Sequence, residues 1–239
     1  MSYHKTVTEF TPVNTGRISA EIADQIKAAI REGRLGAGDQ LPAERELTKQ
    51  LGVSRVSVRD ALRMLEAQGL IEVRVGARGG AFVTTPAPSL VSEGFADLLR
   101  MSDVSPADVT EMRLIFELAM LPLAVERATE DDLAALAAIC AASEAEGYDV
   151  ARSAEFHTRL AACTHNDALA LFAESFHQPL LRSLQVAKRV APEMGGAGTR
   201  EHLELIDAMR DRDVARAVTI LSAHLGRTAE RLDSAHGPG

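Results

Sequence analysis

Residues 41–65, LPAERELTKQLGVSRVSVRDALRML, contain two short amphipathic helical patterns joined by a Gly-Val-Ser turn. Pro42 suits the first position of a helix, where its missing N–H would be unpaired anyway. Gly52 suits the left-handed backbone position that follows a helix, and Ser54 can cap the next helix with its hydroxyl. The stretch therefore predicts a helix, a tight turn and a second helix.

The second helix separates apolar from basic residues. Its apolar residues recur at i, i+3, i+4 and i+7, so we expect one buried face made of Val58, Ala61, Leu62 and Leu65. Arg55, Ser57, Arg59 and Arg63 lie mainly off that face. Arginine can pair with phosphate or with guanine O6 and N7, so the pattern predicts a helix that enters a DNA groove. The alternative is an ordinary solvated face of charged residues.

The flanks of this pair supply two more elements. Upstream, Ile22, Ile26 and Ile30 step by four and predict a first helix. Downstream, residues 71–75 alternate as a strand does, the glycine-rich residues 76–80 predict a tight turn, and residues 81–83 a returning strand. Three helices followed by a hairpin make a winged helix-turn-helix, which we assign to residues 1–85.

The charge of the chain divides between two parts. The 239 residues carry a net charge of −8. Residues 1–85 hold 12 Lys and Arg against 10 Asp and Glu, so residues 86–239 carry a net charge of −10. DNA affinity depends on local neutralisation of phosphates, so an acidic second domain is compatible with DNA binding. No apolar run approaches the roughly 20 residues of a membrane span, and we expect a cytoplasmic protein without membrane contact.

Residues 86–239 are almost wholly helical in pattern. Pro86 and Pro88 predict a short, stiff linker over residues 86–88, and residues 89–239 form the second domain. We predict helices near residues 89–101, 106–127, 130–145, 149–164, 167–190, 200–210 and 214–233. The fold class is therefore mainly α, with a C-terminal antiparallel bundle of six to seven helices whose interior suits a small ligand.

Three histidines and one arginine share stripes with apolar residues of this bundle. His157, His202 and His224 should point inward, and the last two lie at similar depth on helices joined by a short turn. Facing imidazoles suggest a metal site, whereas the alternative is a set of hydrogen-bonded polar residues in the core. Arg113 should also point inward, where its charge needs a partner. Pairing with Glu117, one turn on, is the structural interpretation, and binding of a carboxylate ligand is the functional one.

Residues 19–83 closely resemble the DNA-binding domain of the GntR superfamily of bacterial regulators, through LPAERELTKQLGVSRVSVRDALRMLEAQGLI and VGARGGAFV. The resemblance implies contacts with double-stranded DNA from six residues: Arg45, Ser54, Arg55, Ser57, Arg59 and Gly76. Val56 departs from relatives that carry a polar residue at this position.

Residues 89–233 are similar to the FCD ligand-sensing domain of the fatty-acid-regulator (FadR) branch of that superfamily. The matching stretches include Arg113–Glu117, Glu155–His157 and the surroundings of His202 and His224. The resemblance implies one divalent metal, zinc or nickel, held by an aspartate and three histidines. The three histidines map to His157, His202 and His224. Ser153 stands where the aspartate is expected. The resemblance also implies that Arg113 binds the carboxylate of an organic-acid effector.

These observations predict a ligand-responsive transcriptional regulator, with repression the expected sign. As a homodimer it would bind a short pseudo-palindromic operator, and an effector would shift the domain arrangement across residues 86–88. Two alternatives are a metal-dependent helical-bundle enzyme fused to a DNA-binding domain and a ligand-free architectural DNA binder. The sequence contains no catalytic motif such as His-Glu-x-x-His or a P-loop, so we expect no enzyme.

Overall fold

The computed structural model describes residues 15–76, 79–191 and 194–235, which form two compact units, residues 1–87 and residues 88–239. Ala77 and Arg78 of the expected hairpin turn lie outside the described residues. No helix in the described ranges is both long and apolar enough to span a membrane. The two units are described separately below.

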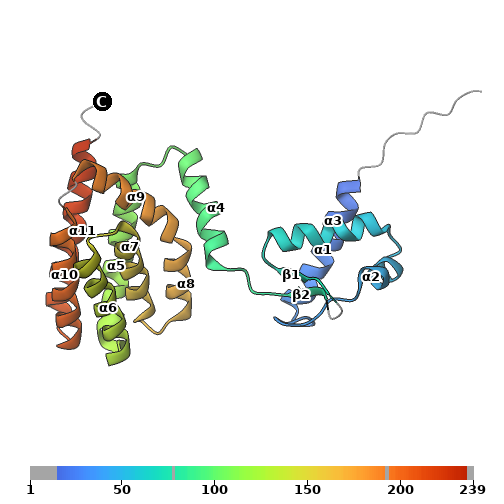
Figure 1. Cartoon of the computed structure of the whole chain (residues 1–239), viewed down its shortest axis with the longest axis horizontal. Helices are drawn as coiled ribbons and strands as arrows, with labels where there is room; N and C mark the ends of the chain where they lie inside the picture. The colour runs from blue at the N-terminus through green and yellow to red at the C-terminus, as the bar shows by residue number, and fades with distance from the viewer. Residues whose placement is uncertain (1–14, 77–78, 192–193, 236–239) are drawn as a thin grey trace, which may run out of the picture. The chain divides into compact units, whose positions relative to one another are not determined.

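The first unit contains three helices and a hairpin (Figure 1), with the bounds α1 (Thr15–Arg31), α2 (Glu44–Leu51), α3 (Arg55–Ala67), β1 (Ile71–Arg74) and β2 (Gly80–Val83). The strands pair antiparallel, with Ile71 opposite Val83 and Arg74 opposite Gly80. Helix α3 packs against α1, α2 and β1. One apolar core joins all three helices to the hairpin, and its members include Ile22, Ile26, Leu47, Val58, Leu62, Leu65, Ile71 and Val83. The predicted winged helix-turn-helix is confirmed.

The second unit is a bundle of helices without strands in the described residues (Figure 1), with the bounds α4 (Pro88–Met101), α5 (Pro106–Arg127), α6 (Glu130–Glu146), α7 (Val150–Ala162), α8 (Asp167–Ser175), α9 (His177–Val190), α10 (Met194–Arg210) and α11 (Val214–Ala235). Side-chain caps begin several of them. Ser105 and Thr129 each form a reciprocal capping box, with Asp108 and Asp132 respectively. The predicted mainly helical class is confirmed.

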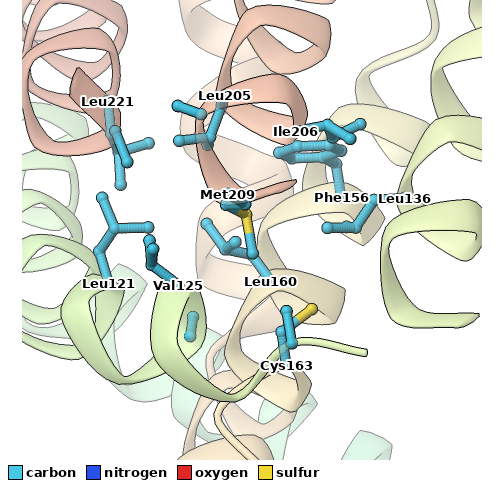
Figure 2. Close-up of a cluster of buried hydrophobic side chains, with 14 of the residues drawn as sticks. Leu121, Val125, Leu136, Phe156, Leu160, Cys163, Leu205, Ile206, Met209 and Leu221 are labelled. Atoms are coloured by element: carbon cyan, nitrogen blue, oxygen red, sulfur yellow. The ribbon is translucent and has the colours of Figure 1, made fainter. Parts of the chain in front are cut away.

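The bundle core lies among α5, α6, α7, α10 and α11. Helix α11 packs along α5, and α10 packs between α11 and α6. Figure 2 shows the apolar side chains that meet there, and those it labels are Leu121, Val125, Leu136, Phe156, Leu160, Cys163, Leu205, Ile206, Met209 and Leu221. This packing fixes α7, α10 and α11 relative to one another, and each of these three helices carries one of the histidines singled out above.

Several helix bounds differ from the sequence prediction. The single helix predicted over 167–190 is two helices, α8 and α9, which meet at Phe176 with φ −95° and ψ −1°. Pro179 lies in the first turn of α9, where a missing N–H costs no hydrogen bond. Helix α10 begins at Met194 rather than near residue 200, because packing overrides the low helix propensity of its three glycines. Helix α4 begins at Pro88, inside the predicted linker.

Candidate DNA-binding surface and candidate metal centre

The turn between α2 and α3 has the geometry that its residues predict. Gly52 adopts φ 66° and ψ 29°, a left-handed conformation that glycine takes without steric cost. The Ser54 hydroxyl accepts a hydrogen bond from the Ser57 amide at 3.1 Å and so caps α3. The apolar face of α3 is buried at Val58, Leu62 and Leu65. The opposite face of α3 is therefore held rigidly toward solvent.

Arginines cover this solvent face. Arg55 and Arg59 are exposed on α3, and Arg45 is exposed on α2. Val56, between the basic positions, is 66% exposed. Ser57 differs from the other expected contacts because it is buried, with its hydroxyl 3.0 Å from the Ser54 hydroxyl.

The start of the wing is open to solvent. Gly76 has φ 116°, and, apart from its chain neighbours, no heavy atom of the described residues lies within 4 Å of the position where a Cβ would be. At Gly79 a Cβ would meet the Arg74 carbonyl oxygen at 2.4 Å, so the hairpin closes too tightly for any side chain there. Gly76 is thus free to approach a DNA backbone closely.

One acidic residue on the basic surface was missed by the sequence reasoning. Glu44, at the start of α2, accepts the Arg59 Nε–H between its two carboxylate oxygens and lies 3.9 Å from Arg55 Nη2. No local pattern signals these contacts, because 15 residues separate Glu44 from Arg59. They arise only when α2 packs on α3.

The three predicted histidines meet in the interior of the second unit. His157 on α7, His202 on α10 and His224 on α11 are all buried. The His202 Nε2 atom lies 3.2 Å from the His157 Nε2 atom and 3.3 Å from the His224 Nε2 atom. The Phe156 ring stacks on the His202 ring with centroids 3.8 Å apart, which fixes the orientation of that imidazole. The structure therefore brings together the residues that the sequence only placed on apolar stripes.

Two carboxylates orient the outer histidines. Glu117 Oε2 lies 2.7 Å from His157 Nδ1, and Glu201 Oε2 lies 2.7 Å from His224 Nδ1. A carboxylate only accepts hydrogen bonds, so each Nδ1 carries the proton and each Nε2 presents a lone pair. His202 Nε2 can donate to only one of these two lone pairs. A cation at the centre would satisfy all three nitrogens at once.

The separations also fit a metal ion. Zinc–nitrogen bonds of about 2.0–2.1 Å at a tetrahedral angle place two ligand nitrogens about 3.3–3.4 Å apart. The candidate ligand atoms of the three histidines all lie within 4.8 Å of one another. Ser153 is buried on the same helix as His157, and Asp149 instead caps α7 through the Ala151 amide. The candidate protein ligands are therefore three imidazoles, which would leave a further position for another donor.

Burial keeps these imidazoles neutral. Desolvation, together with the charge of Arg113, lowers the pKa of His157 from 6.5 to about 4. Desolvation also lowers the pKa values of His202 and His224. Burial raises the pKa of the Glu117 carboxyl, but the Arg113 charge and His157 outweigh it, so this pKa is lowered overall. Neutral imidazoles near an ionised carboxylate are the form that binds a divalent metal.

Acid should destabilise the metal-free protein through these histidines. The unfolded chain takes up a proton at His157 near the ordinary pKa of 6.5, whereas the folded chain does so only near 4. Stability is therefore fully present above pH 6.5 and is lost as the pH falls toward 4, with about 2 kcal/mol lost by pH 5 from His157 alone. Urea unfolding with a chelator across this range measures the loss. His157→Gln should flatten the profile, and an equally steep profile in that variant would contradict the assignment.

The orienting carboxylates should matter for metal affinity. Glu201→Gln keeps the shape of the side chain but weakens the hydrogen bond that makes His224 a stronger ligand, so we expect an affinity loss of about 10–100-fold. Isothermal titration with zinc measures it. Glu204→Gln, an exposed substitution on the same helix, is the matched control and should change the affinity little. Equal affinities of the two variants would remove Glu201 from the site.

Arg113 lies beside this cluster. Its Nε donates to Glu117 Oε1 at 2.5 Å, so the structural pairing with Glu117 is present. Its Nη2 is nevertheless buried without a hydrogen-bond partner among the described residues. The Tyr148 hydroxyl is also buried, in a small cavity that Ser153 and His224 line as well. Tyr148 was not predicted, because a single tyrosine in a loop gives no periodic signal.

Comparisons with known proteins agree with both units. Residues 18–83 match the family profile described as "Bacterial regulatory proteins, gntR family", and residues 108–227 match the FCD domain. The chain is 32% identical over 229 residues to the "Putative L-lactate dehydrogenase operon regulatory protein" of Escherichia coli (strain K12), covering 91% of this chain and 88% of the relative. It is 30% identical to the "HTH-type transcriptional repressor NanR" of Salmonella newport, covering 90% and 85% respectively.

A solved structure extends the similarity to the fold. "Streptococcus agalactiae GntR" matches with a TM-score of 0.63 and 26% identity, and the match covers 89% of this chain and 98% of the other.

Proposed function

Because this chain belongs to the GntR family of bacterial regulatory proteins and carries an FCD domain, we propose that it binds a short pseudo-palindromic operator as a homodimer and responds to a carboxylate-bearing effector. The family consists of transcriptional regulators, not enzymes. The finer parts of the proposal concern which residues contact DNA, which bind the effector and how the two events are linked.

The exposed arginines support the DNA half of the proposal. Arg55 and Arg59 on α3 would pair with base edges in the major groove, and Arg45 with the groove edge or phosphate. Ser54, at the N-terminus of α3, would approach a phosphate oxygen, with Ser57 behind it as the donor that fixes its orientation. Gly76 would allow the wing to approach the minor groove. In a homodimer two such surfaces would read two half-sites.

The Arg113 Nη2 atom, which is buried without a hydrogen-bond partner in the described ranges, carries the effector half of the proposal. An arginine nitrogen buried without a hydrogen bond is costly, and a carboxylate is the group that best satisfies it. Arg113 and His157 line the same small cavity. A carboxylate bound there would contact the arginine while remaining beside the histidine cluster. Organic acids are therefore the ligand class that this geometry favours.

The histidine cluster supports a bound divalent metal, which we propose to be zinc or nickel held by His157, His202 and His224. When bound, the metal would supply a Lewis-acidic position that attracts an effector carboxylate. Since Ser153 contributes no charge where an aspartate is expected, the ligand set would leave the full positive charge of the metal available to that anion.

Repression with release by the effector is the proposed mode of regulation. The similar Salmonella protein is named a transcriptional repressor. An effector that binds the DNA-free arrangement of the protein more tightly than the DNA-bound arrangement would lower operator affinity. At saturation the factor equals the ratio of the effector's affinities for the two arrangements.

Selection from a random DNA pool tests the proposal. The full-length protein should enrich a sequence with two related half-sites, and the complex should contain two chains per duplex in analytical ultracentrifugation. Enrichment of no sequence would overturn the DNA-binding half. Organic acids are then titrated, with zinc present, into the complex with the selected DNA while fluorescence anisotropy follows release.

Arg113→Lys is the matched variant for the effector half. Lysine keeps a positive charge beside Glu117 but lacks the second nitrogen that pairs with a carboxylate. This variant should bind the selected DNA as the wild type does and lose most of its response to the active acid. An undiminished response would remove Arg113 from the effector site.

A further inference from the structure

We propose that Glu44 is the residue that sets DNA specificity by positioning Arg59, so that this arginine reads a guanine rather than phosphates. The inference rests on the proposed DNA-binding function and adds a role for an acidic residue on a basic surface. It depends on which nitrogens of the arginine are hydrogen-bonded to Glu44, on which helix carries Glu44 and on how the charge of Glu44 affects DNA affinity.

Glu44 occupies one edge of the Arg59 guanidinium and leaves the other free. Both carboxylate oxygens accept from Arg59 Nε, at 3.2 and 3.1 Å. Within the described part of the chain, the hydrogen bonds of the Arg59 side chain all start at Nε. The two Nη groups are therefore available, and they are the pair that contacts O6 and N7 of guanine in a bidentate arrangement. The carboxylate thus fixes the guanidinium plane without consuming the donors that read a base.

The contact comes from a different helix, so it fixes Arg59 relative to the whole helix-turn-helix. Glu44 begins α2, and α2 packs on α3. The Glu44 side chain is 32% exposed, whereas the Arg59 side chain is 61% exposed. Arg63, one turn further along α3, pairs instead with Asp60 of its own helix. Glu44 therefore contacts the two arginines nearest the N-terminus of α3, Arg55 and Arg59. In helix-turn-helix proteins this end of the recognition helix contacts the bases.

A carboxylate at this place weakens binding to any DNA, because it opposes the phosphates and neutralises arginine charge. A helix-stabilising role alone does not account for its position, since Glu46 places a second acid in the same first turn of α2. Specificity is the ratio of the affinity for the operator to the affinity for other DNA. A charge that weakens binding through phosphates alone raises this ratio, provided that the arginine still reaches its base. The geometry at Nε meets that condition.

Glu44→Gln tests the charge, and Glu46→Gln is its matched control. Glu46 is exposed on the same helix and accepts a hydrogen bond from Gln50 of that helix. The probes are the DNA selected by the wild type and a random duplex of equal length, measured by anisotropy over a range of salt. We expect Glu44→Gln to bind random DNA several-fold more tightly than the wild type does. The ratio of the affinity for selected DNA to the affinity for random DNA should fall about 10-fold, which is the size of the affinity loss that one mismatched base pair causes. Glu46→Gln should leave the ratio within about twofold of wild type.

A modified base shows whether Glu44 acts through Arg59. Each guanine of the selected half-site is replaced in turn by 7-deazaguanine, which lacks the N7 acceptor. The guanine that Arg59 reads is the one whose replacement does not change the affinity of Arg59→Ala. At this guanine the replacement should lower the affinity of the wild type about 10-fold. It should lower the affinities of Glu44→Gln and Glu44→Ala less than about threefold.

The results separate this inference from the proposed function. If the wild type enriches no DNA, the proposed function fails. If it enriches an operator but Glu44→Gln keeps both the wild-type affinity ratio and the full 7-deazaguanine penalty, the positioning role of Glu44 is overturned and DNA binding stands. Unchanged thermal unfolding of Glu44→Gln and Glu44→Ala excludes a loss of fold as the cause of a lowered ratio.

Discussion

His224→Ala should abolish stoichiometric metal binding. The wild-type protein is expected to hold about one divalent ion per chain, and removal of a direct ligand should cost more than the roughly 100-fold that loss of an outer hydrogen-bond partner costs. The remaining imidazoles, His157 and His202, offer only two of the three converging nitrogens. Glu201 keeps its ion pair with Arg227, so the substitution does not leave that carboxylate unpaired.

Elemental analysis of protein purified without a histidine tag measures the metal content directly. Thermal unfolding with and without zinc provides a second readout, because a metal present at 100 times its dissociation constant stabilises the wild type by about 2.7 kcal/mol. His177→Ala is the matched control, since His177 is half-buried in the same unit but hydrogen-bonds Thr158 outside the cluster. Equal metal content in wild type and His224→Ala would refute the metal centre.

Arg55→Ala should reduce operator affinity by about 1–3 kcal/mol, or roughly 5–150-fold, while leaving the fold intact. The fold should survive because the Arg55 side chain is 69% exposed, and its ion pair with Glu44 is long, at 3.9 Å. The loss of operator affinity should exceed the loss caused by removing a positive charge outside the DNA-binding surface. Arg55 lies on the face of α3 that is opposite the buried core.

Anisotropy titrations at one fixed salt concentration measure this effect, because protein–DNA affinities depend steeply on salt. Arg210→Ala, which removes an exposed arginine from the helical unit, makes the same change in net charge and should alter operator affinity by less than about twofold. Unchanged operator affinity in Arg55→Ala would refute the assignment of α3 as the helix that reads DNA.

The winged unit was largely predictable from the sequence, because its signals are local. The spacing of Val58, Leu62 and Leu65 specifies the buried face of α3, Gly52 meets the need for a left-handed residue, and Ser54 caps the helix that follows. Each of these is decided within one or two helical turns. The contacts of Glu44 with Arg55 and Arg59 were not predictable, since they require α2 and α3 to be packed at a particular distance.

In the helical unit, the sequence predicted that His157, His202 and His224 face inward, and the structure confirms their burial. It did not predict that Glu117 and Glu201 would each orient one of these imidazoles. Glu201 precedes His202 in the chain but contacts His224, 23 residues further on. The break at Phe176 was also missed, because the apolar pattern continues across it and only the packing of α8 and α9 on α7 shows the change of direction.

The fold class, the exposed basic face and the set of inward histidines could be read from the residues alone, because periodicity, capping residues and glycine conformations act over a few residues. Three further features follow from tertiary packing. Three Nε2 atoms converge, two carboxylates set the tautomers of His157 and His224, and Arg113 Nη2 is buried with no hydrogen-bond partner in the part of the chain that the structure describes. These are relations between side chains on different helices, and their distances follow from how the cores pack rather than from any spacing along the chain.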